Sequence, residues 1–356
     1  MRQPQPQPGI MDIALYQGGK AKIAGKSVVV KLSSNENPLG PSKEAIAAFQ
    51  TAAQSLNRYP SDTHQDLRDV IGAHLGLDPA RILCGAGSDE IIAFLCQAFA
   101  GPGDEVLYTE YGFLMYKIGA LAAGATPVEV PEDNRHTDVD ALLDAITERT
   151  KLIFIANPNN PTGTFIPMDE IERLATSIPK NVILVLDGAY AEYVDGYDGG
   201  ATLVEAQENV VMTRTFSKLY GLGGLRIGYG YAPQNIYDAI ARVRGPFNVT
   251  SPALAAAEAA MKDQQYAQYC LDENRIWGDY LVSELNVLGI ATDPTFANFV
   301  LARFADANTA DHAFTTLGAA GFVVRQMSGY KMPDALRITI GREQDCKAII
   351  AALKGI

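Results

Sequence analysis

The sequence predicts an α/β protein with a large domain, built on a mainly parallel seven-stranded sheet covered by helices, and a smaller α+β domain. Three observations support this. Strand-like and helix-like segments alternate through the middle of the chain, as they do where helices join parallel strands. Several strand candidates are continuous apolar runs, which is typical of strands buried on both faces. The 356 residues also exceed the usual size of a single core.

The predicted large domain, residues 41–255, contains the alternating segments. Its first helix begins after Ser42, the expected N-cap, and places Ala45, Ile46 and Phe49 on its apolar side. The expected strands are 81–84, 105–109, 126–130, 152–156, 182–186, 210–213 and 226–231. The other expected helices are 65–75, 88–99, 113–123, 138–145, 168–177 and 232–242.

Two further segments flank this domain. Residues 1–40 form an N-terminal arm with one strand-like stretch, 27–32, and the proline- and glutamine-rich residues 1–9 are expected to be disordered. Residues 256–356 are predicted to form the small domain, with which the arm is able to pack. Its expected elements are a long helical region from about 252 to 286, strands 299–303 and 336–340, and helices 309–320 and 343–353.

Composition excludes several classes of function. The formal net charge is −12, and a nucleic-acid partner would require a basic face. The four cysteines are scattered without a Cys-x-x-Cys pair, so neither a disulfide framework nor a metal site is predicted. No apolar run has the length of a membrane span, and the N-terminus does not resemble a secretory signal. We therefore expect a cytoplasmic protein whose main partner is not a nucleic acid.

A lysine stands at the centre of the most informative segment, residues 213–231. Lys218 lies between the hydroxyl residues Thr215 and Ser217 and a glycine-rich run, and Arg226 follows. A lysine becomes a nucleophile when its charged form is disfavoured or when a carbonyl cofactor holds it. The hydroxyls and the arginine are suited to bind a phosphate beside it. An exposed lysine after a turn is the structural alternative.

A glycine-rich connection, residues 85–90, joins a predicted strand to a helix. Gly87 allows close backbone approach, and the first turn of the helix, at Ser88 and Asp89, offers free N–H groups to an anion. This predicts a cup for a phosphate. An ordinary helix N-cap by Ser88 is an equally good interpretation of this motif alone.

Two more strand ends carry polar residues. The run Asn157-Pro158-Asn159-Asn160-Pro161-Thr162-Gly163 ends one strand and leaves an amide at its tip, although a plain turn is the alternative. Asp187 follows another apolar run and precedes Tyr190. A buried carboxylate needs a cation or a donor, unless it merely caps the strand. In parallel sheets, ligands bind at the carboxyl ends of the strands, where all these residues fall.

Together these motifs resemble the pyridoxal-phosphate aminotransferases of fold type I, and the resemblance runs from about residue 16 to the C-terminus. Within that family the chain is most similar to the histidinol-phosphate aminotransferase branch. The segments that suggest this branch are 35–38, 57–60, 87–90, 216–218, 224–226 and 336–341. The resemblance implies a homodimer in which each cofactor site is completed by the other subunit.

The resemblance also implies roles for single residues. Lys218 is the Schiff-base lysine and the proton carrier, and Asp187 contacts the pyridine nitrogen. Asn160 and Tyr190 contact the phenolic oxygen. The remaining cofactor contacts fall on Gly87, Ser88, Asp89, Thr215, Ser217 and Arg226, with Phe113 or Tyr111 stacked on the ring and Tyr59 reaching the phosphate of the other subunit. The substrate contacts fall on Tyr16, Asn37, Arg325 and Arg337.

The substrate side departs from the family pattern. Residues 15–19 read Leu-Tyr-Gln-Gly-Gly where the family commonly has Pro-Tyr-x-Pro-Gly, and residues 110–116 lack the usual Pro-Thr-Tyr form. For Arg337, an internal salt bridge to Asp334 or Glu36 is the alternative to a substrate contact. The predicted reaction transfers the amino group of L-histidinol phosphate to 2-oxoglutarate. An aromatic amino-acid aminotransferase, a decarboxylase of a phosphorylated amino acid and a non-catalytic binding protein are the rival interpretations.

Overall fold

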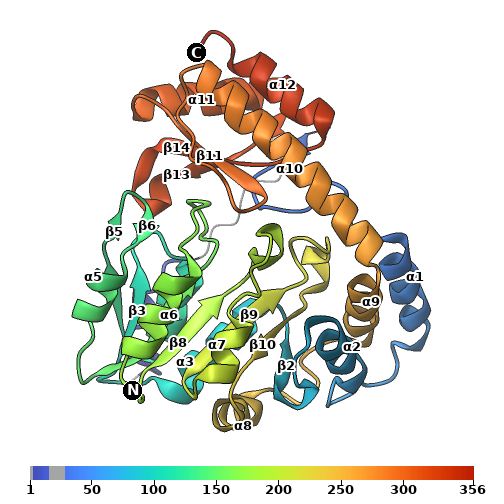
Figure 1. The fold of residues 1–356 in the computed structure, drawn as a ribbon, viewed down its shortest axis with the longest axis vertical. Helices are drawn as coiled ribbons and strands as arrows, with labels where there is room; N and C mark the ends of the chain where they lie inside the picture. Colours follow the sequence, from blue (N-terminus) through green and yellow to red (C-terminus); the bar gives the residue numbers. More distant parts are fainter. Residues whose placement is uncertain (1–2, 16–28) are drawn as a thin grey trace.

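The computed structural model describes residues 3–15 and 29–356, which form two lobes (Figure 1). The lower lobe contains the large sheet, and the upper lobe contains a small sheet near the C-terminus. The long helix α10 (Gln264–Val287) runs diagonally from one lobe to the other. Among the described residues, no helix has the length and apolarity needed to cross a membrane. The domain boundaries at residues 40 and 255 remain predictions.

The large sheet has seven strands in the order β2-β10-β9-β8-β7-β3-β4. Neighbours from β9 to β4 run parallel, whereas β10 is antiparallel to both β2 and β9. The predicted α/β class with a mainly parallel sheet is therefore confirmed. The strands are β2 (Ile82–Gly85), β3 (Glu105–Thr109), β4 (Thr126–Val130), β7 (Thr150–Ala156), β8 (Ile183–Asp187), β9 (Val210–Thr215) and β10 (Gly228–Tyr231). A short hairpin, β5 (Glu132–Asp133) and β6 (His136–Thr137), follows β4.

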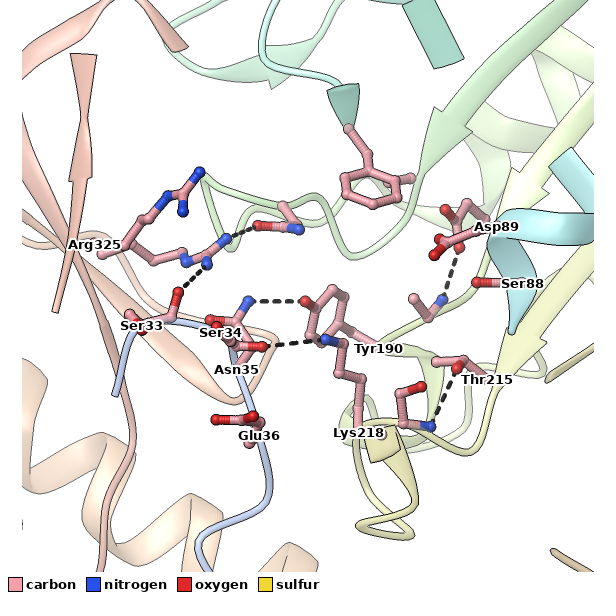
Figure 2. Close-up of a pocket in the computed structure, with 18 of the residues that line it drawn as sticks. Ser33, Ser34, Asn35, Glu36, Ser88, Asp89, Tyr190, Thr215, Lys218 and Arg325 are labelled. Carbon is pink, nitrogen blue, oxygen red and sulfur yellow. Dashed lines mark hydrogen bonds between the residues drawn. The ribbon is translucent and has the colours of Figure 1, made fainter. Parts of the chain in front are cut away.

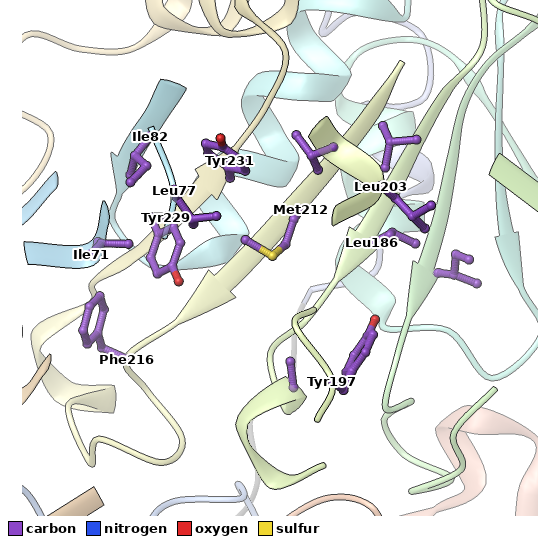
Figure 3. Packing of buried hydrophobic residues seen from close by; sticks show 14 of the residues in the cluster. Ile71, Leu77, Ile82, Leu186, Tyr197, Leu203, Met212, Phe216, Tyr229 and Tyr231 are labelled. Carbon is purple, nitrogen blue, oxygen red and sulfur yellow. The ribbon is translucent and has the colours of Figure 1, made fainter. Parts of the chain in front are cut away.

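Helices cover both faces of this sheet because successive residues of its central strands point to opposite sides. On β8, Leu184 and Leu186 join one buried cluster, whereas Val185 joins the other. The first cluster, part of which is drawn in Figure 3, packs against α2 (Gln65–Leu75), α5 (Val139–Asp144), α6 (Met168–Ser177), α7 (Ala201–Ala206) and α9 (Ser251–Lys262). The second packs against α3 (Ser88–Phe99), α4 (Leu114–Ala122) and α8 (Gln234–Val243).

Helix α1 (Lys43–Ala52) begins as predicted, since the Ser42 side chain accepts from the Ala45 N–H at 3.1 Å. Of the residues predicted to lie on its apolar side, Ala45 is buried, whereas Ile46 and Phe49 are 43% and 37% exposed. Helix α1 packs on α9. Ala45, the buried residue of α1, and the buried alanines of α9 have small side chains, which permit close helix approach.

The small lobe has a three-stranded antiparallel sheet in the order β11-β14-β13, covered by helices. Its elements are β11 (Phe299–Arg303), β13 (Arg325–Met327), β14 (Met332–Thr339), α11 (Ala307–Ala320) and α12 (Glu343–Leu353). The N-terminal arm joins this lobe, because β1 (Val30–Lys31) pairs with β12 (Phe322–Val323). Residues 27 and 28 of the predicted arm strand lie outside the described residues.

The single long helix predicted from about 252 to 286 is instead two helices, α9 and α10. Asp263 separates them with φ −88° and ψ 68°, and its side chain caps α10 by accepting from the Tyr266 N–H at 3.1 Å. A capping aspartate competes with helix continuation, which explains the break. The four cysteines are free and buried.

Candidate active site

A cavity of about 350 Å³ lies where β7, β8 and β9 end, and residues of both lobes line it (Figure 2). Its walls bring together most of the site residues predicted from the sequence. These are Ser88, Asp89, Phe113, Asn160, Asp187, Tyr190, Thr215, Ser217, Lys218, Arg226, Arg325 and Arg337. Residues as far apart in the sequence as Ser88 and Arg337 thus meet around one space. Those from β7, β8 and β9 lie at the carboxyl ends of parallel strands, where ligands are expected to bind.

Asp187 ends β8 and is fully buried in the cavity wall. Its carboxylate accepts from the Tyr116 hydroxyl at 2.7 Å, the Ala189 N–H at 3.1 Å and the Thr213 hydroxyl at 3.2 Å. Burial nevertheless raises the pKa of Asp187 above its ordinary value. A carboxylate has about four acceptor positions. These three donors therefore leave room for one more, and the carboxylate lines the cavity.

Lys218 lies in the turn after β9, and its amine points into the same space. Its Nζ donates to the Ser34 carbonyl at 3.4 Å and lies 5.7 Å from the centre of the Tyr190 ring. Burial, and then the positive charge of Arg337, lowers the pKa of Lys218 to about 8. Among the described residues no carboxylate forms an ion pair with it. Part of this lysine is consequently neutral near physiological pH, as a nucleophile or base requires.

The glycine-rich connection forms a cup with Ser217 and Arg226. Gly87 is the N-cap of α3, with φ +85°, and a Cβ atom there would lie 2.3 Å from Arg226 Nη2. The alternative that Ser88 is the N-cap is therefore wrong, because Ser88 is the first residue of the helix. Arg226 donates to the Ser217 hydroxyl at 3.3 Å and to Asp89 at 3.1 Å. A guanidinium, a hydroxyl and a helix N-terminus thus lie close together, which suits a phosphate.

Two amides line the same cavity as Tyr190. Asn160, the predicted partner, lines the cavity and accepts a short hydrogen bond from Arg337. Asn35, which the sequence did not single out, donates to the Tyr190 hydroxyl at 2.8 Å (Figure 2). The predicted substrate residue Asn37 lies outside the cavity wall. Its side chain donates to the Leu219 carbonyl at 2.7 Å and accepts from the Leu39 N–H at 2.9 Å, which fixes the local turn.

Two arginines reach the cavity from the small lobe. Arg325 on β13 and Arg337 on β14 are directly paired across the sheet. Arg337 is buried, donates to the Ser33 carbonyl at 3.0 Å and lies over the Phe299 ring at 5.3 Å. The alternative partner Glu36 instead forms an ion pair with Lys31 at 2.7 Å.

Four predicted aromatic residues remain, and they differ in where they lie. Phe113 lines the cavity, whereas Tyr111 packs against the small-lobe cluster of Leu301 and Met327, so Phe113 is the better candidate for ring stacking. Tyr59 is 82% exposed and stacks on Phe247 at 4.6 Å. Tyr16 lies outside the described residues.

Comparisons with known proteins agree with this geometry. The family model for aminotransferase class I and II matches residues 27–353. The chain is 60% identical to a histidinol-phosphate aminotransferase of Dinoroseobacter shibae and 61% identical to one of a Ruegeria species. Each alignment covers 99% of this chain and 98% of the relative.

Solved structures show the same fold. The crystal structure of histidinol-phosphate aminotransferase from Sinorhizobium meliloti, in complex with pyridoxal-5'-phosphate, superposes with a TM-score of 0.87 at 26% identity. This match covers 97% of this chain and 95% of that one. An aspartate aminotransferase of Thermus thermophilus, at 23% identity, shares the fold with a TM-score of 0.80 over 91% of each chain.

Proposed function

This chain belongs to the class I and II aminotransferase family, and on that premise we propose that it transfers the amino group of L-histidinol phosphate to 2-oxoglutarate. The products are imidazole-acetol phosphate and L-glutamate, a step of histidine biosynthesis. Identity over nearly the whole chain to relatives that bear this name carries the proposal. The two cavity arginines support it, because guanidinium groups bind both phosphate and carboxylate.

The family implies pyridoxal phosphate as cofactor, and the cavity fits that group. Asp187 is a buried carboxylate with an acceptor position left for a pyridine N–H, and Lys218 is a buried amine without a carboxylate partner among the described residues. The cup of Gly87, Ser217 and Arg226 is suited to a phosphate. The other groups proposed to hold the cofactor are Ser88, Asp89, Phe113, Asn160, Tyr190 and Thr215.

The chemistry then divides among these side chains. Pyridoxal phosphate, when bound, supplies an electron sink for the negative charge that develops on the substrate α-carbon. Lys218 takes and returns the α-proton, and its pKa of about 8 lies close to the pH at which it must do both. Asp187 keeps a proton on the pyridine nitrogen, and Tyr190 donates to the phenolic oxygen.

The substrate assignment is tested by comparing amino donors. With 2-oxoglutarate as acceptor, kcat/KM for L-histidinol phosphate should exceed kcat/KM for L-phenylalanine. The guanidinium pair should favour a phosphate dianion over a single carboxylate. A preference for phenylalanine would replace the proposal with an aromatic aminotransferase. Release of carbon dioxide from a phosphorylated amino acid would replace it with a decarboxylase.

We also propose that the protein is a homodimer and acts in the cytoplasm. Large apolar side chains are exposed along α1 and near its C-terminal end: Ile46, Phe49, Leu56, Tyr59 and Phe247. Burying them against a second copy would remove this surface from water. Tyr59 is exposed and is not part of its own cavity wall, so it is available to the phosphate cup of the partner.

A further inference from the structure

Hydrogen bonds connect strand β14 of the small lobe with Tyr190 in the cavity wall, and Asn35 stands between them. The Asn35 N–H donates to the Thr339 hydroxyl at 3.0 Å, and the Asn35 side-chain nitrogen donates to the Tyr190 hydroxyl at 2.8 Å. The Thr339 hydroxyl donates to Asn35 Oδ1 at 3.3 Å. All three residues are at most 2% exposed. The three residues are therefore largely shielded from bulk water.

Asn35 is held in place from several sides. Its backbone lies in the left-handed region, with φ 56°, which costs energy in a non-glycine residue. Its carbonyl accepts from the Asn298 side chain at 2.9 Å. A strained residue of this kind persists where its surroundings determine its conformation.

The donor directions follow from the number of hydrogens. A hydroxyl has one hydrogen to donate, and that of Thr339 goes to Asn35 Oδ1. The amide oxygen thus faces Thr339 as an acceptor, and the amide nitrogen faces Tyr190 as a donor. An amide nitrogen donates and does not accept. The Tyr190 hydroxyl must accept from it, so its own hydrogen is left for the cavity.

We propose that Asn35 and Thr339 are positioning residues that keep Tyr190 a hydrogen-bond donor toward the cavity. Building on the proposed function, the acceptor is the phenolic oxygen of pyridoxal phosphate. Thr339 also lies two residues beyond Arg337 on β14, so both point to the same face of the strand. Strand β14 of the small lobe thus contributes the proposed substrate arginine, and through Thr339 and Asn35 it also orients Tyr190.

The test is the pH midpoint of the absorbance change of bound pyridoxal phosphate. In Asn35→Asp the carboxylate has no N–H to donate, so the Tyr190 hydrogen turns toward it and away from the cofactor oxygen. An oxygen that loses a donor holds a proton more tightly. The midpoint should therefore rise by about one to two pH units, the size of a hydrogen bond to a charged group.

Tyr190→Phe should raise the midpoint by a similar amount, and the double variant should raise it no further. The added negative charge would act even without the Tyr190 hydroxyl, so additive shifts would overturn the proposal, as would an unchanged midpoint in Asn35→Asp. Asn274→Asp is the matched control. This change adds the same charge on α10, where the Asn274 amide donates to the Ala297 carbonyl at 3.2 Å, and it should leave the midpoint unchanged.

The other charged groups near Tyr190 stay the same in these variants. They are Arg337 from β14, Asp187 from β8, Asp89 from α3 and Lys218 over the ring. Thr339→Val should shift the midpoint in the same direction as Asn35→Asp, and Thr339→Ser should restore it. If the midpoint shifts in Thr339→Val and shifts equally in Thr339→Ser, the Thr339 hydroxyl has no such role.

A measurement without cofactor separates this inference from the proposed function. In the apoprotein, Asn35→Gly keeps the positive φ and removes the amide. The loss of thermal stability in the double variant should be smaller than the sum of the losses in Asn35→Gly and Tyr190→Phe, because both substitutions remove the same Asn35–Tyr190 hydrogen bond. Additive losses would overturn the inference. Failure of the wild type to develop a pyridoxal-phosphate absorbance band would instead refute the proposed cofactor.

Discussion

Replacing Asp187 by asparagine should separate catalysis from folding. Asparagine has nearly the same shape, and its oxygen retains the Ala189 N–H and Thr213 hydroxyl as donors, while Tyr116 is able to reorient and accept. A neutral amide does not keep the pyridine nitrogen protonated. We expect kcat to fall by at least 10²–10³-fold, about 3–4 kcal/mol in the barrier, as when a buried electrostatic contact is removed.

The same substitution should raise the thermal stability of the apoprotein, although it lowers kcat of the loaded enzyme. Burial raises the pKa of Asp187, so the folded state binds more protons than the unfolded state between the two pKa values. Stability therefore falls as the pH rises through that window, and the ionised side chain remains unfavourable above it. Apo Asp187→Asn should thus unfold at a higher temperature than apo wild type at neutral pH. The advantage should shrink as the pH falls toward the unfolded-state value of about 3.9.

Asp198→Asn is the matched control for both measurements. Burial by itself would raise the pKa of Asp198, but hydrogen bonds from Thr202 and Gly200 outweigh it and hold that pKa below the ordinary value. The control should therefore lose stability at neutral pH and keep its kcat. The assays are steady-state turnover of the cofactor-loaded enzyme and thermal unfolding of the apoprotein. A change in kcat below about tenfold for Asp187→Asn would mean that the pyridine partner lies elsewhere.

Three other predictions address the amine, the substrate and the assembly. Lys218→Ala should retain the fold but lose turnover and the visible absorbance of the bound cofactor. Lys180→Ala, at an exposed lysine, should change neither property. Ordinary activity of Lys218→Ala without added amine would disprove the assignment. Arg325→Ala should reduce kcat/KM for histidinol phosphate more than for glutamate or phenylalanine, by roughly 1.5–3 kcal/mol, and Arg337→Ala should impair all three donors; equal losses at Arg325 would contradict the phosphate role. Inactive Lys218→Ala and inactive Tyr59→Glu subunits should regain activity when mixed as hybrid dimers, and a monomer in sedimentation would refute the shared site.

Much of the large sheet was predictable because its strands are apolar runs bounded by turn residues. Helices α3, α6 and α12 also have the predicted bounds, since each begins and ends at a clear break in the apolar pattern. The short strands β12 and β13 were not predictable. Their two or three residues are strands because β1 and β14 pair with them, and such pairing is not visible in a local pattern.

The site shows the same division. Asp187 and Lys218 were predictable because polar residues at the ends of apolar strands point to a ligand. Tyr116 was missed because its contact with Asp187 depends on how α4 packs over the sheet. Asn35 and Asn37 are two residues apart in one turn-rich segment. The sequence reveals neither the positive φ at Asn35 nor that Asn35, and not Asn37, donates to Tyr190.

The pairing of β14 has a consequence for engineering. In this strand Arg337 and Thr339 face the cavity side, Ile338 faces the buried cluster, and β11 and β13 fix the register from both sides. Inserting or deleting one residue within the strand would exchange the two faces and bury the arginine in an apolar core. A chimaera designed to change the substrate should therefore take β14 as an indivisible block with the arm residues that contact it. Changes of length belong in the turn at 328–331.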